Sequence, residues 1–299
     1  MKKINDLLRE YSIKPYRYTK EGKAVIVDTN EKRYVIKEHF NKDEKIYNYL
    51  ASRNFNYYPK ILNDNNDDYQ IMEYIDQYNI PSEQKIIDLV DLVALLHSKT
   101  THFKETTEDE YKEIYEDISN NIIYLNSYYN DLINIIDTKV YPSPSEYLLA
   151  RNISKIFASL KFSEHELEEW YEIVKKTNKK RLVVLHNNLD LSHFLRNNNS
   201  YLISWEKSKI DMPIFDLYKL YKRVGLDFEF TEILKRYEKN YPLLKEERKL
   251  LFILMALPDK IDFTNDEYEN TKKMGRMIDL VYKTEMIISP YYSKEGEAK

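Results

Sequence analysis

The stretch VVLHNNLDLSHFLRNNNSYLISWEKSKIDMPIFDLYKLYKR, residues 183–223, decides the fold that we expect. Its first residues are apolar and β-branched, and the polar segment HNNLD follows at 186–190, which is typical of a strand that runs into a loop. HFLR (193–196) and SYLISW (200–205) flank the turn sequence NNN and predict a hairpin. After Pro213 the remaining sequence is predicted to be helical. The stretch therefore predicts a strand, a polar loop, a hairpin and a helix in succession.

Upstream of this stretch, the first 76 residues predict short helices and strand pairs. The expected elements are a helix at 1–10, strands at 23–29 and 33–40, a helix at 43–52, and strands at 57–64 and 68–75. Turn residues lie between the members of each strand pair. This order suits a small, mostly antiparallel sheet that is covered by a helix.

From Pro81 onwards, helical patterns dominate. The expected helices are 82–100, 108–136, 145–161, 163–177, 214–224, 228–239, 245–256 and 265–288. The chain is therefore expected to have an α+β fold with two lobes, a sheet-containing lobe at 1–76 and a mainly helical lobe at 77–299.

The segment 108–136 carries a heptad seam, because its apolar residues step by four and three: Tyr111, Tyr115, Ile118, Ile122, Leu125, Tyr129, Leu132 and Ile136. We expect the neighbouring helices 145–161 and 163–177 to cover this seam within the chain. The alternative is a dimer through helix 108–136. Ser163 and Glu166 form a capping-box pattern and predict the start of the second covering helix.

Composition excludes several classes of protein. The net charge is −4 with the signs interspersed, which does not suit a nucleic-acid surface. The absence of cysteine excludes disulfides, cysteine zinc sites and thiol catalysis. No apolar run reaches the length of a membrane span, and the N-terminus lacks the apolar core of a secretory signal. The histidines show no metal-ligand spacing. We therefore expect a cytoplasmic protein that binds neither nucleic acid nor membrane.

Three features of the N-terminal part suit the binding of a nucleotide. Lys37 lies mid-strand among apolar neighbours and can grip phosphate oxygens, and Glu44 on the following helix can hold it in place. The backbone around Met72, Glu73 and Ile75 can bond the edge of an adenine ring. Each residue alone is more typical of a solvated charge or an ordinary strand, but their order ahead of the polar loop favours a site.

VVLHNNLDLSHFL followed by YLISWEKSKIDMPIFDL resembles the catalytic core of the aminoglycoside phosphotransferase and choline kinase family, which has a protein-kinase-like fold. The family pattern is His-Gly-Asp, four residues, Asn, a strand that ends in Ile-Asp-Trp/Phe-Glu/Asp, and then Pro-x-x-Asp-Leu. Here His186 matches the motif histidine, and five further residues match outright: Trp205, Glu206, Pro213, Asp216 and Leu217. The resemblance implies a two-lobed kinase-like fold with a catalytic-core remnant at 181–217, in which His186 and Asp216 are scaffold residues.

The departures from the pattern concern the chemistry. Asn187 takes the place of the glycine, Asn188 that of the catalytic aspartate, His193 that of the metal-binding asparagine, and Ser204 that of the metal-binding aspartate. Phosphoryl transfer in such a site needs a carboxylate to orient the attacking hydroxyl, and magnesium ions that carboxylates hold. Asn188 cannot accept a proton, Ser204 has no anionic oxygen, and imidazole suits softer metals than magnesium.

The resemblance and its departures together predict a pseudokinase-like protein that is catalytically inactive and acts by binding or assembly, with a protein partner or a small molecule. ATP or another nucleotide is the expected ligand, with weak magnesium dependence and no resident metal. The alternative is an active phosphotransferase that passes phosphate from ATP to a hydroxyl of an amino alcohol or aminoglycoside, through a rewired site of Asp190, His193 and Glu206. The tyrosine- and lysine-rich segment DMPIFDLYKLYK also resembles the kinase-like spore-coat proteins of Firmicutes.

Overall fold

The computed structural model describes residues 2–38, 41–63 and 69–296. At residues 2–3, 41–45 and 293–296 the description covers the backbone and leaves out the side chains. The chain packs into two compact units. The first comprises Met1–Thr100 and His186–Lys209, and the second comprises Thr101–Leu185 and Ile210–Lys299. The lobe boundary expected at residues 76–77 stays a prediction. The two units are described separately below.

The first unit contains a four-stranded antiparallel sheet in the order β1-β2-β3-β4. The strands are β1 (Pro15–Glu21), β2 (Ala24–Thr29), β3 (Arg33–Glu38) and β4 (Tyr69–Glu73). The strand pair expected at 23–29 and 33–40 corresponds to β2 and β3. Strand β1 escaped prediction because it is a polar edge strand that pairs with β2 alone, and a two-residue turn with Gly22 at φ 57° joins the two.

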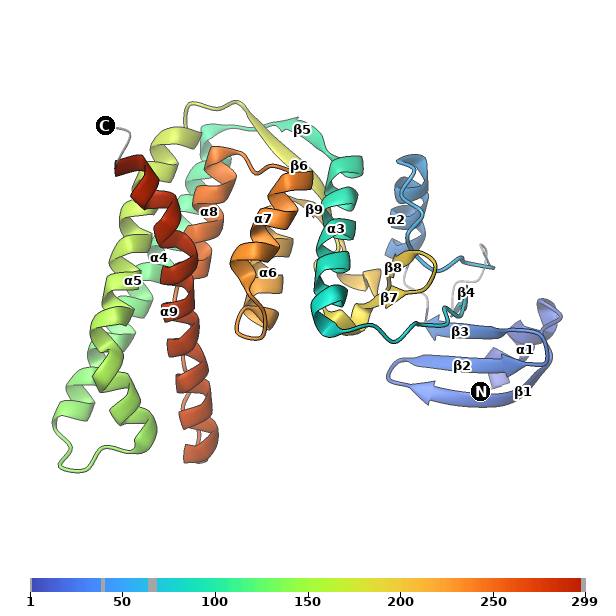
Figure 1. The fold of residues 1–299 in the computed structure, drawn as a ribbon, viewed down its shortest axis with the longest axis horizontal. Coiled ribbons are helices and arrows are strands. Elements are labelled where there is room, and N and C mark those ends of the chain that lie inside the picture. The colour runs from blue at the N-terminus through green and yellow to red at the C-terminus, as the bar shows by residue number, and fades with distance from the viewer. Residues whose placement is uncertain (1, 39–40, 64–68, 297–299) are drawn as a thin grey trace. The chain divides into compact units, whose positions relative to one another are not determined.

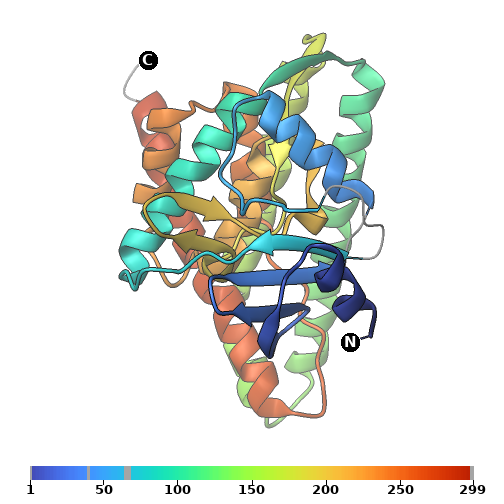
Figure 2. The same ribbon diagram turned by 90° about the vertical axis from the view of Figure 1, so that its right-hand side faces the viewer.

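Helix α1 (Lys2–Glu10) packs on one face of this sheet (Figure 2). Its apolar side chains form a buried core with one side chain from each of β2, β3 and β4: Ile4, Leu7 and Leu8 with Val27, Ile36 and Ile71. Since successive residues of a strand point to opposite faces, this packing assigns the alternate residues of β2, β3 and β4 to the other face.

Of the strand expected at 57–64, the described residues 57–63 make a single bridge, between Ile61 and Met72. Two backbone bonds flank the bridge, from Leu62 N–H to Ile71 O at 2.9 Å and from Glu73 N–H to Lys60 O at 2.9 Å. Pro59 has no N–H and restricts the residue before it, so a regular ladder cannot extend through this segment. The expected turn at 64–68 lies outside the described residues.

Helices and a short hairpin complete the first unit. They are α2 (Asn41–Ser52), α3 (Ser82–Thr100), β7 (Phe194–Arg196) and β8 (Ser200–Leu202), with single 3-10 turns at Leu191–His193 and Trp205–Lys207. The hairpin is the expected one, but β8 ends at Leu202 instead of continuing to 205. The segment after this early end carries Ser204 and Glu206, which belong to the candidate site.

In the second unit, α4 (Glu108–Asp137) lies along α5 (Pro144–Val174), as Figure 1 shows. Six of the eight seam residues are buried, all except Tyr115 and Leu132. The ring centroids of Tyr111 and Trp170 are 5.9 Å apart, and those of Tyr115 and Tyr171 are 4.8 Å apart. The seam therefore packs against α5 within the chain, and the dimer through this helix stays an untested prediction.

The expected helices 145–161 and 163–177 are one continuous helix, so the predicted start at Ser163 is wrong. Ser163 and Glu166 are buried in the interior of α5, where Ser163 Oγ donates to Ile253 O and Lys249 bonds Glu166. The capping box lies instead at Ser143 and Glu146. The Ser-x-x-Glu pattern is local, and without a glycine or proline nearby the apolar periodicity continues through it.

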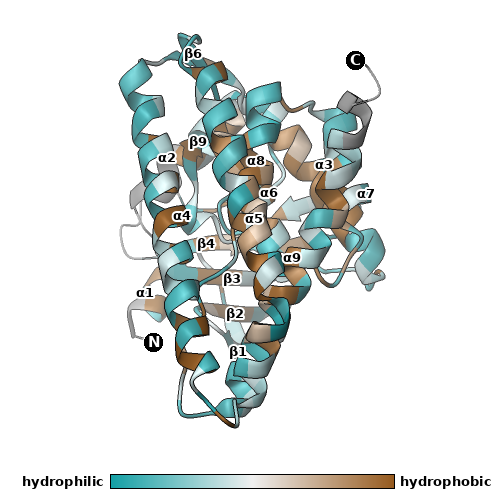
Figure 3. Ribbon diagram, turned by 90° about the vertical axis from the view of Figure 1, so that its left-hand side faces the viewer, coloured by the Kyte–Doolittle hydropathy of each residue, from teal (hydrophilic) through white to brown (hydrophobic). Residues whose placement is uncertain are grey.

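The remaining elements also belong to the second unit, apart from Lys209 at the start of β9. They are β5 (His102–Glu105), β6 (Lys179–Leu185) and β9 (Lys209–Asp211) in one sheet, with helices α6 (Ile214–Val224), α7 (Phe230–Asn240), α8 (Lys245–Ala256) and α9 (Glu267–Gly296). Figure 3 shows apolar and polar segments alternating along α4, α5 and α9. Within the described part of the chain, no helix combines the length and apolar character that crossing a membrane requires.

Glu267 links α9 to the start of α5 and makes the stability of the fold depend on pH. It accepts the backbone N–H of Ser145 at 2.7 Å, and this bond, with side-chain bonds from Ser145, Ser143 and Asn270, lowers the pKa of Glu267 to about 2. Because the folded-state pKa lies below the unfolded one, the stabilisation is complete above pH ~4.5 and is lost as the pH falls towards ~2.

We therefore expect Glu267→Gln to lower the free energy of unfolding at pH 7 by at most about 1 kcal/mol, because solvent screens an accessible carboxylate. At pH 2 the difference from the wild type should vanish. Urea unfolding at both pH values measures it, with Glu168→Gln at an exposed position of α5 as the control. An equal deficit at pH 7 and pH 2 would show that the carboxylate charge has no role.

Candidate functional site

Lys37 lies on the sheet face that α1 does not cover. In the antiparallel register Lys37 is opposite Ala24 and Gln70, and Val35 is opposite Ile26 and Met72. Directly opposed residues point to the same side of a sheet, so one face carries an apolar surface with an ammonium group beside it. The residues of this face are Ala24, Ile26, Val35, Lys37, Gln70 and Met72.

The Lys37 ammonium contacts two side chains from the segment that follows β8. Its Nζ is 3.5 Å from Ser204 Oγ and 3.5 Å from Glu206 Oε1. The Lys37 side chain is only 18% exposed, so this pair is better shielded from solvent than an ordinary surface pair. Lys37 thus meets two residues that lie far from it in the sequence.

A reversal of the chain at Ser204 explains this meeting. Ser204 has φ 69° and ψ 55°, a left-handed conformation that is uncommon for residues other than glycine, and a 3-10 turn over Trp205–Lys207 follows. The strand that the sequence predicts to run to residue 205 has therefore already ended, so Ser204 and Glu206 do not lie on a strand. Both side chains nevertheless reach Lys37, by way of the turn.

Trp205 anchors the turn between these two residues. Its side chain is 1% exposed, and its Nε1–H donates to Leu202 O at 2.9 Å. Its ring makes edge contacts with His186, Phe55 and Tyr47 at centroid distances of 4.8, 6.2 and 6.5 Å. This aromatic cluster fixes the direction in which Ser204 and Glu206 leave the backbone.

His186 is fully buried beneath the same turn. Its Nε2–H donates to Ile203 O at 2.9 Å, since a carbonyl oxygen can only accept. Together with the edge contact to Trp205, this bond links His186 to the segment after β8. The contacts of His186 are thus those of a residue that supports the loop.

Asn187 occupies a left-handed position with φ 59°, and its Nδ2–H donates to Lys207 O at 2.7 Å. This conformation explains why the resembled pattern has glycine here, because asparagine and glycine are the residues that tolerate it best.

We expect Asn187→Ala to lower the free energy of unfolding by about 1–2 kcal/mol, through backbone strain and the lost bond. Asn187→Gly loses the same bond without strain and should cost less. Chemical unfolding of the two variants separates the effects. Equal stability of both would contradict a role for the left-handed backbone.

Asn188 and His193 are brought together by their own loop. His193 Nδ1 lies 2.7 Å from Asn188 O and donates to it, so a neutral His193 ring carries its lone pair on Nε2. Both residues are partly exposed. Neither residue offers a carboxylate, so the proton acceptor of this pair is the Nε2 lone pair of a neutral His193.

Asp190 is engaged in capping its own loop. Its Oδ1 accepts both the backbone N–H of Ser192 at 2.8 Å and the Ser192 hydroxyl at 2.7 Å. Lys85 of α3 lies near it: burial lowers the pKa of Lys85, and the Asp190 charge offsets part of that effect. A role as general base would have to use the carboxylate lone pairs that Ser192 does not occupy, or would require Asp190 to release Ser192.

The other residues expected to bind a nucleotide have different positions. The Glu44 side chain lies outside the described residues, so its pairing with Lys37 stays a prediction. Met72 shares the face of Lys37, whereas Glu73 points to the α1 side. The N–H groups of Glu73 and Tyr74 already donate to Lys60 O and Arg33 O. Backbone bonds to an adenine edge would therefore begin at Ile75.

The donor set at this site does not fit a pair of magnesium ions. Magnesium needs carboxylate oxygens together with phosphates, and the positions that the resemblance assigns to its ligands hold a hydroxyl at Ser204 and an imidazole at His193. The nearby carboxylate, Glu206, pairs with an ammonium 3.5 Å away. That ammonium would repel a divalent cation at the same place.

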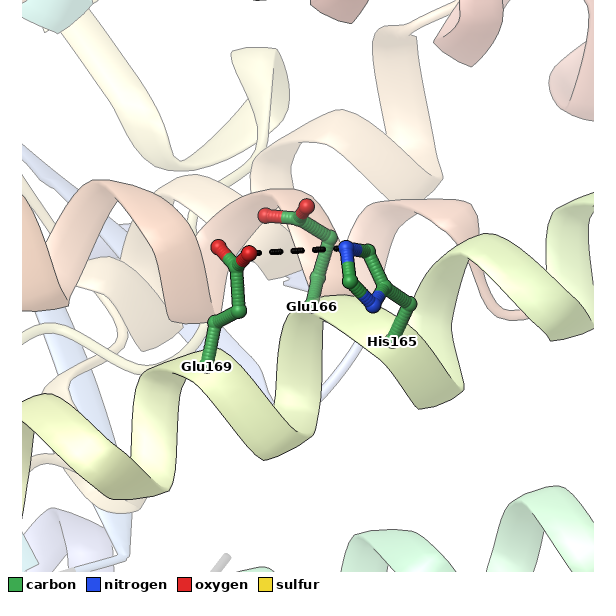
Figure 4. Close-up of side chains that lie close together, drawn as sticks. All are labelled: His165, Glu166 and Glu169. Carbon is green, nitrogen blue, oxygen red and sulfur yellow. Dashed lines mark ion pairs between the residues drawn. The ribbon is translucent and has the colours of Figure 1, made fainter.

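A second group of polar side chains lies in the other unit, on α5, and the sequence spacing did not suggest it. The ligand atoms of His165, Glu166 and Glu169 lie within 4.8 Å of one another, with His165 Nε2 3.4 Å from Glu169 Oε1 (Figure 4). Lys249 Nζ bonds both carboxylates, at 2.8 Å in the case of Glu169. The Lys249 ammonium therefore offsets one of the two carboxylate charges and holds both side chains in an ion-pair cluster within the protein.

No protein-family model matches the chain, and no curated protein matches it by sequence. Solved structures do match. An aminoglycoside phosphotransferase from Alicyclobacillus acidocaldarius is 12% identical with a TM-score of 0.67, over 94% of this chain and 92% of that one. An AMP-bound spectinomycin phosphotransferase is 13% identical with a TM-score of 0.56, over 94% and 98%.

The choline kinase LicA from Streptococcus pneumoniae is 16% identical with a TM-score of 0.51, over 93% of this chain and 99% of that one. Identities this low show the fold alone. They confirm the expected fold class, a small antiparallel-sheet region followed by a mainly helical part. The chain has the protein-kinase-like α+β fold of aminoglycoside phosphotransferases and choline kinase.

Proposed function

We propose that this protein is a catalytically inactive relative of the small-molecule phosphotransferases, and that it acts by binding a nucleotide without magnesium. The single observation that carries the proposal is the position of Lys37. Its ammonium lies 3.5 Å from Glu206 Oε1 and 3.5 Å from Ser204 Oγ, and Ser204 is the position that the resemblance assigns to a metal ligand. The positive charge of the Lys37 ammonium, which belongs to the protein, would thus take the place of the positive charge of an exchangeable metal ion.

The loss of catalysis follows from the residues around this charge. Asn188 stands where the resemblance expects the proton acceptor, and the loss of a positioned base typically removes about 10²–10⁴ in rate. The missing magnesium ligands remove the charge that neutralises the phosphates during transfer. Both losses act on the same step, so phosphate transfer should be undetectable.

The main requirements for nucleotide binding, in contrast, are present. The apolar face of β2, β3 and β4 can receive a base, and Lys37 can bond the phosphates as a charge-assisted donor. Glu206 opposes this binding, because its carboxylate lies where phosphate oxygens would approach the ammonium. Removing the charge of Glu206 should therefore tighten nucleotide binding instead of weakening it.

The test is the thermal stabilisation of the full chain by ATP and ADP, measured in magnesium and in EDTA. We expect equal shifts in both conditions, loss of the shift in Lys37→Met, and a larger shift in Glu206→Gln. The control is Lys99→Met at an exposed position of α3. ATP turnover, measured in parallel, should be absent from the wild type.

Three results would overturn the proposal. A large magnesium-dependent shift, or ATP turnover that disappears in Asp190→Ala, would favour the active alternative with Asp190, His193 and Glu206. The present contacts speak against that alternative, since Asp190 is bonded to Ser192 and Glu206 to Lys37. No shift with any nucleotide would contradict nucleotide binding and leave a role in assembly alone. The spore-coat resemblance and a cytoplasmic location stay predictions.

A further inference from the structure

The second unit contains a cavity of about 240 Å3 between α5, α8 and α9. It exists because small side chains from three helices meet there: Ala158 and Ser159 on α5, Ala256 at the end of α8 and Ser289 on α9. Larger side chains on either side prevent the helices from closing the gap. All of its residues belong to the second unit, whereas the Lys37 site belongs to the first.

The walls of the cavity are largely apolar, and one of them is aromatic. The rings of Phe162 and Tyr292 have centroids 5.5 Å apart and an interplanar angle of 82°. Val281 and Ile288 are buried and contribute aliphatic surface. A ring-shaped ligand gains edge-to-face contacts with such a wall in addition to the burial of its apolar surface.

The charged groups of the lining neutralise one another. Lys155 Nζ bonds Glu285 at 3.0 Å to Oε1 and at 2.8 Å to Oε2. A charged ligand would have to break this pair or lie beside a group of its own sign. An uncharged ligand neither breaks the ion pair nor lies beside a group of its own sign.

The hydroxyl groups of the lining offer acceptors. Ser159 Oγ donates its hydrogen to Ala256 O at 2.6 Å, and the Tyr292 hydroxyl donates to Glu166. A hydroxyl that has donated its hydrogen can still accept a hydrogen bond through its lone pairs. A ligand that donates is therefore better matched than one that only accepts.

We propose that this cavity is a binding site for a small uncharged aromatic molecule that carries one hydroxyl or N–H donor. Benzene binds a cavity of roughly 150 Å3, so 240 Å3 takes a single ring with a short substituent. Ser159 accepts the hydrogen bond, and the ring contacts Phe162 and Tyr292. The site is separate from the proposed nucleotide site, and either can exist without the other.

The experiment uses the full chain and four probes of similar size: 4-methylphenol, toluene, phenylacetate and phenethylamine. Calorimetry and ligand-observed NMR measure their affinities. We expect 4-methylphenol to bind most tightly and the two charged probes most weakly. Ala158→Phe fills the cavity from an exposed position and should lower the affinity for 4-methylphenol by at least about tenfold.

Ser154→Phe makes a similar enlargement at an exposed residue of α5 outside the cavity and should leave the affinity unchanged. Ser159→Ala should weaken the binding of 4-methylphenol but not that of toluene. Ser289→Phe is a second way to fill the cavity if Ala158→Phe unfolds. Tighter binding of either charged probe, equal effects of the two phenylalanine variants on α5, or no saturable binding of 4-methylphenol would each overturn the proposal.

Discussion

Replacing Trp205 by alanine is expected to lower the free energy of unfolding by about 3–5 kcal/mol, the range for a fully buried large aromatic side chain. Its indole is 1% exposed and contacts the rings of His186, Phe55 and Tyr47. The cavity left behind would lie between segments that are distant in the sequence, which cannot all collapse into it. Chemical unfolding, followed by far-UV circular dichroism, measures the loss.

The same substitution should also reduce stabilisation by ATP in EDTA, because Ser204 and Glu206 flank Trp205 and would lose their fixed approach to Lys37. Trp205→Phe is the matched control. It keeps most of the buried surface but loses the Nε1–H bond to Leu202 O, so its cost should be clearly smaller. A Trp205→Ala variant that is as stable as Trp205→Phe would contradict the packing that we describe.

Restoring all three chemical positions should create a dependence on magnesium that the wild type lacks. In the triple variant Asn188→Asp, His193→Asn and Ser204→Asp, two carboxylates and an amide return to the places that the resemblance assigns to the base and the metal ligands. Because magnesium binds through such oxygens together with phosphates, we expect it to tighten ATP binding by about tenfold or more, which is ~1.4 kcal/mol. Calorimetric titration with ATP in magnesium and in EDTA measures the change.

The single variants serve as controls for this experiment. Asn188→Asp alone restores a proton acceptor without the metal ligands, so its ATP affinity should not respond to magnesium. Ser204→Asp alone places a carboxylate beside Lys37 and should weaken ATP binding in EDTA, because it competes with the phosphates for the ammonium. A wild type that already responds to magnesium as strongly as the triple variant would show that the present residues hold the metal.

Much of the secondary structure could be predicted because it depends on local patterns. The heptad steps of 108–136 predicted α4, and the β-branched runs at 23–29 and 33–40 predicted β2 and β3. The strands that were not predicted lack an apolar pattern of their own. β1 is polar and β5 is a short exposed strand, so both exist only because an adjacent strand pairs with them.

Some features of the candidate site could likewise be predicted from the sequence, and others could not. The sequence alone predicted roles for Asn188, His193 and Ser204, because the spacing of 183–223 resembles a known pattern, and a role for Lys37 from its place in a strand ahead of that stretch. It offered Glu44 as the partner of Lys37 and Asp190 as a substitute base. It could not show that Asp190 bonds Ser192.

The amino-acid sequence by itself thus determined the order of the elements and the absence of a carboxylate at three positions, since both are properties of neighbouring residues. Only the tertiary structure decided that the Lys37 ammonium meets Ser204, 167 residues further along the chain, and Glu206. The sheet register chooses the face of Lys37, and the left-handed turn at Ser204 directs the two partners towards it. Such contacts depend on packing between distant segments, which no local pattern encodes.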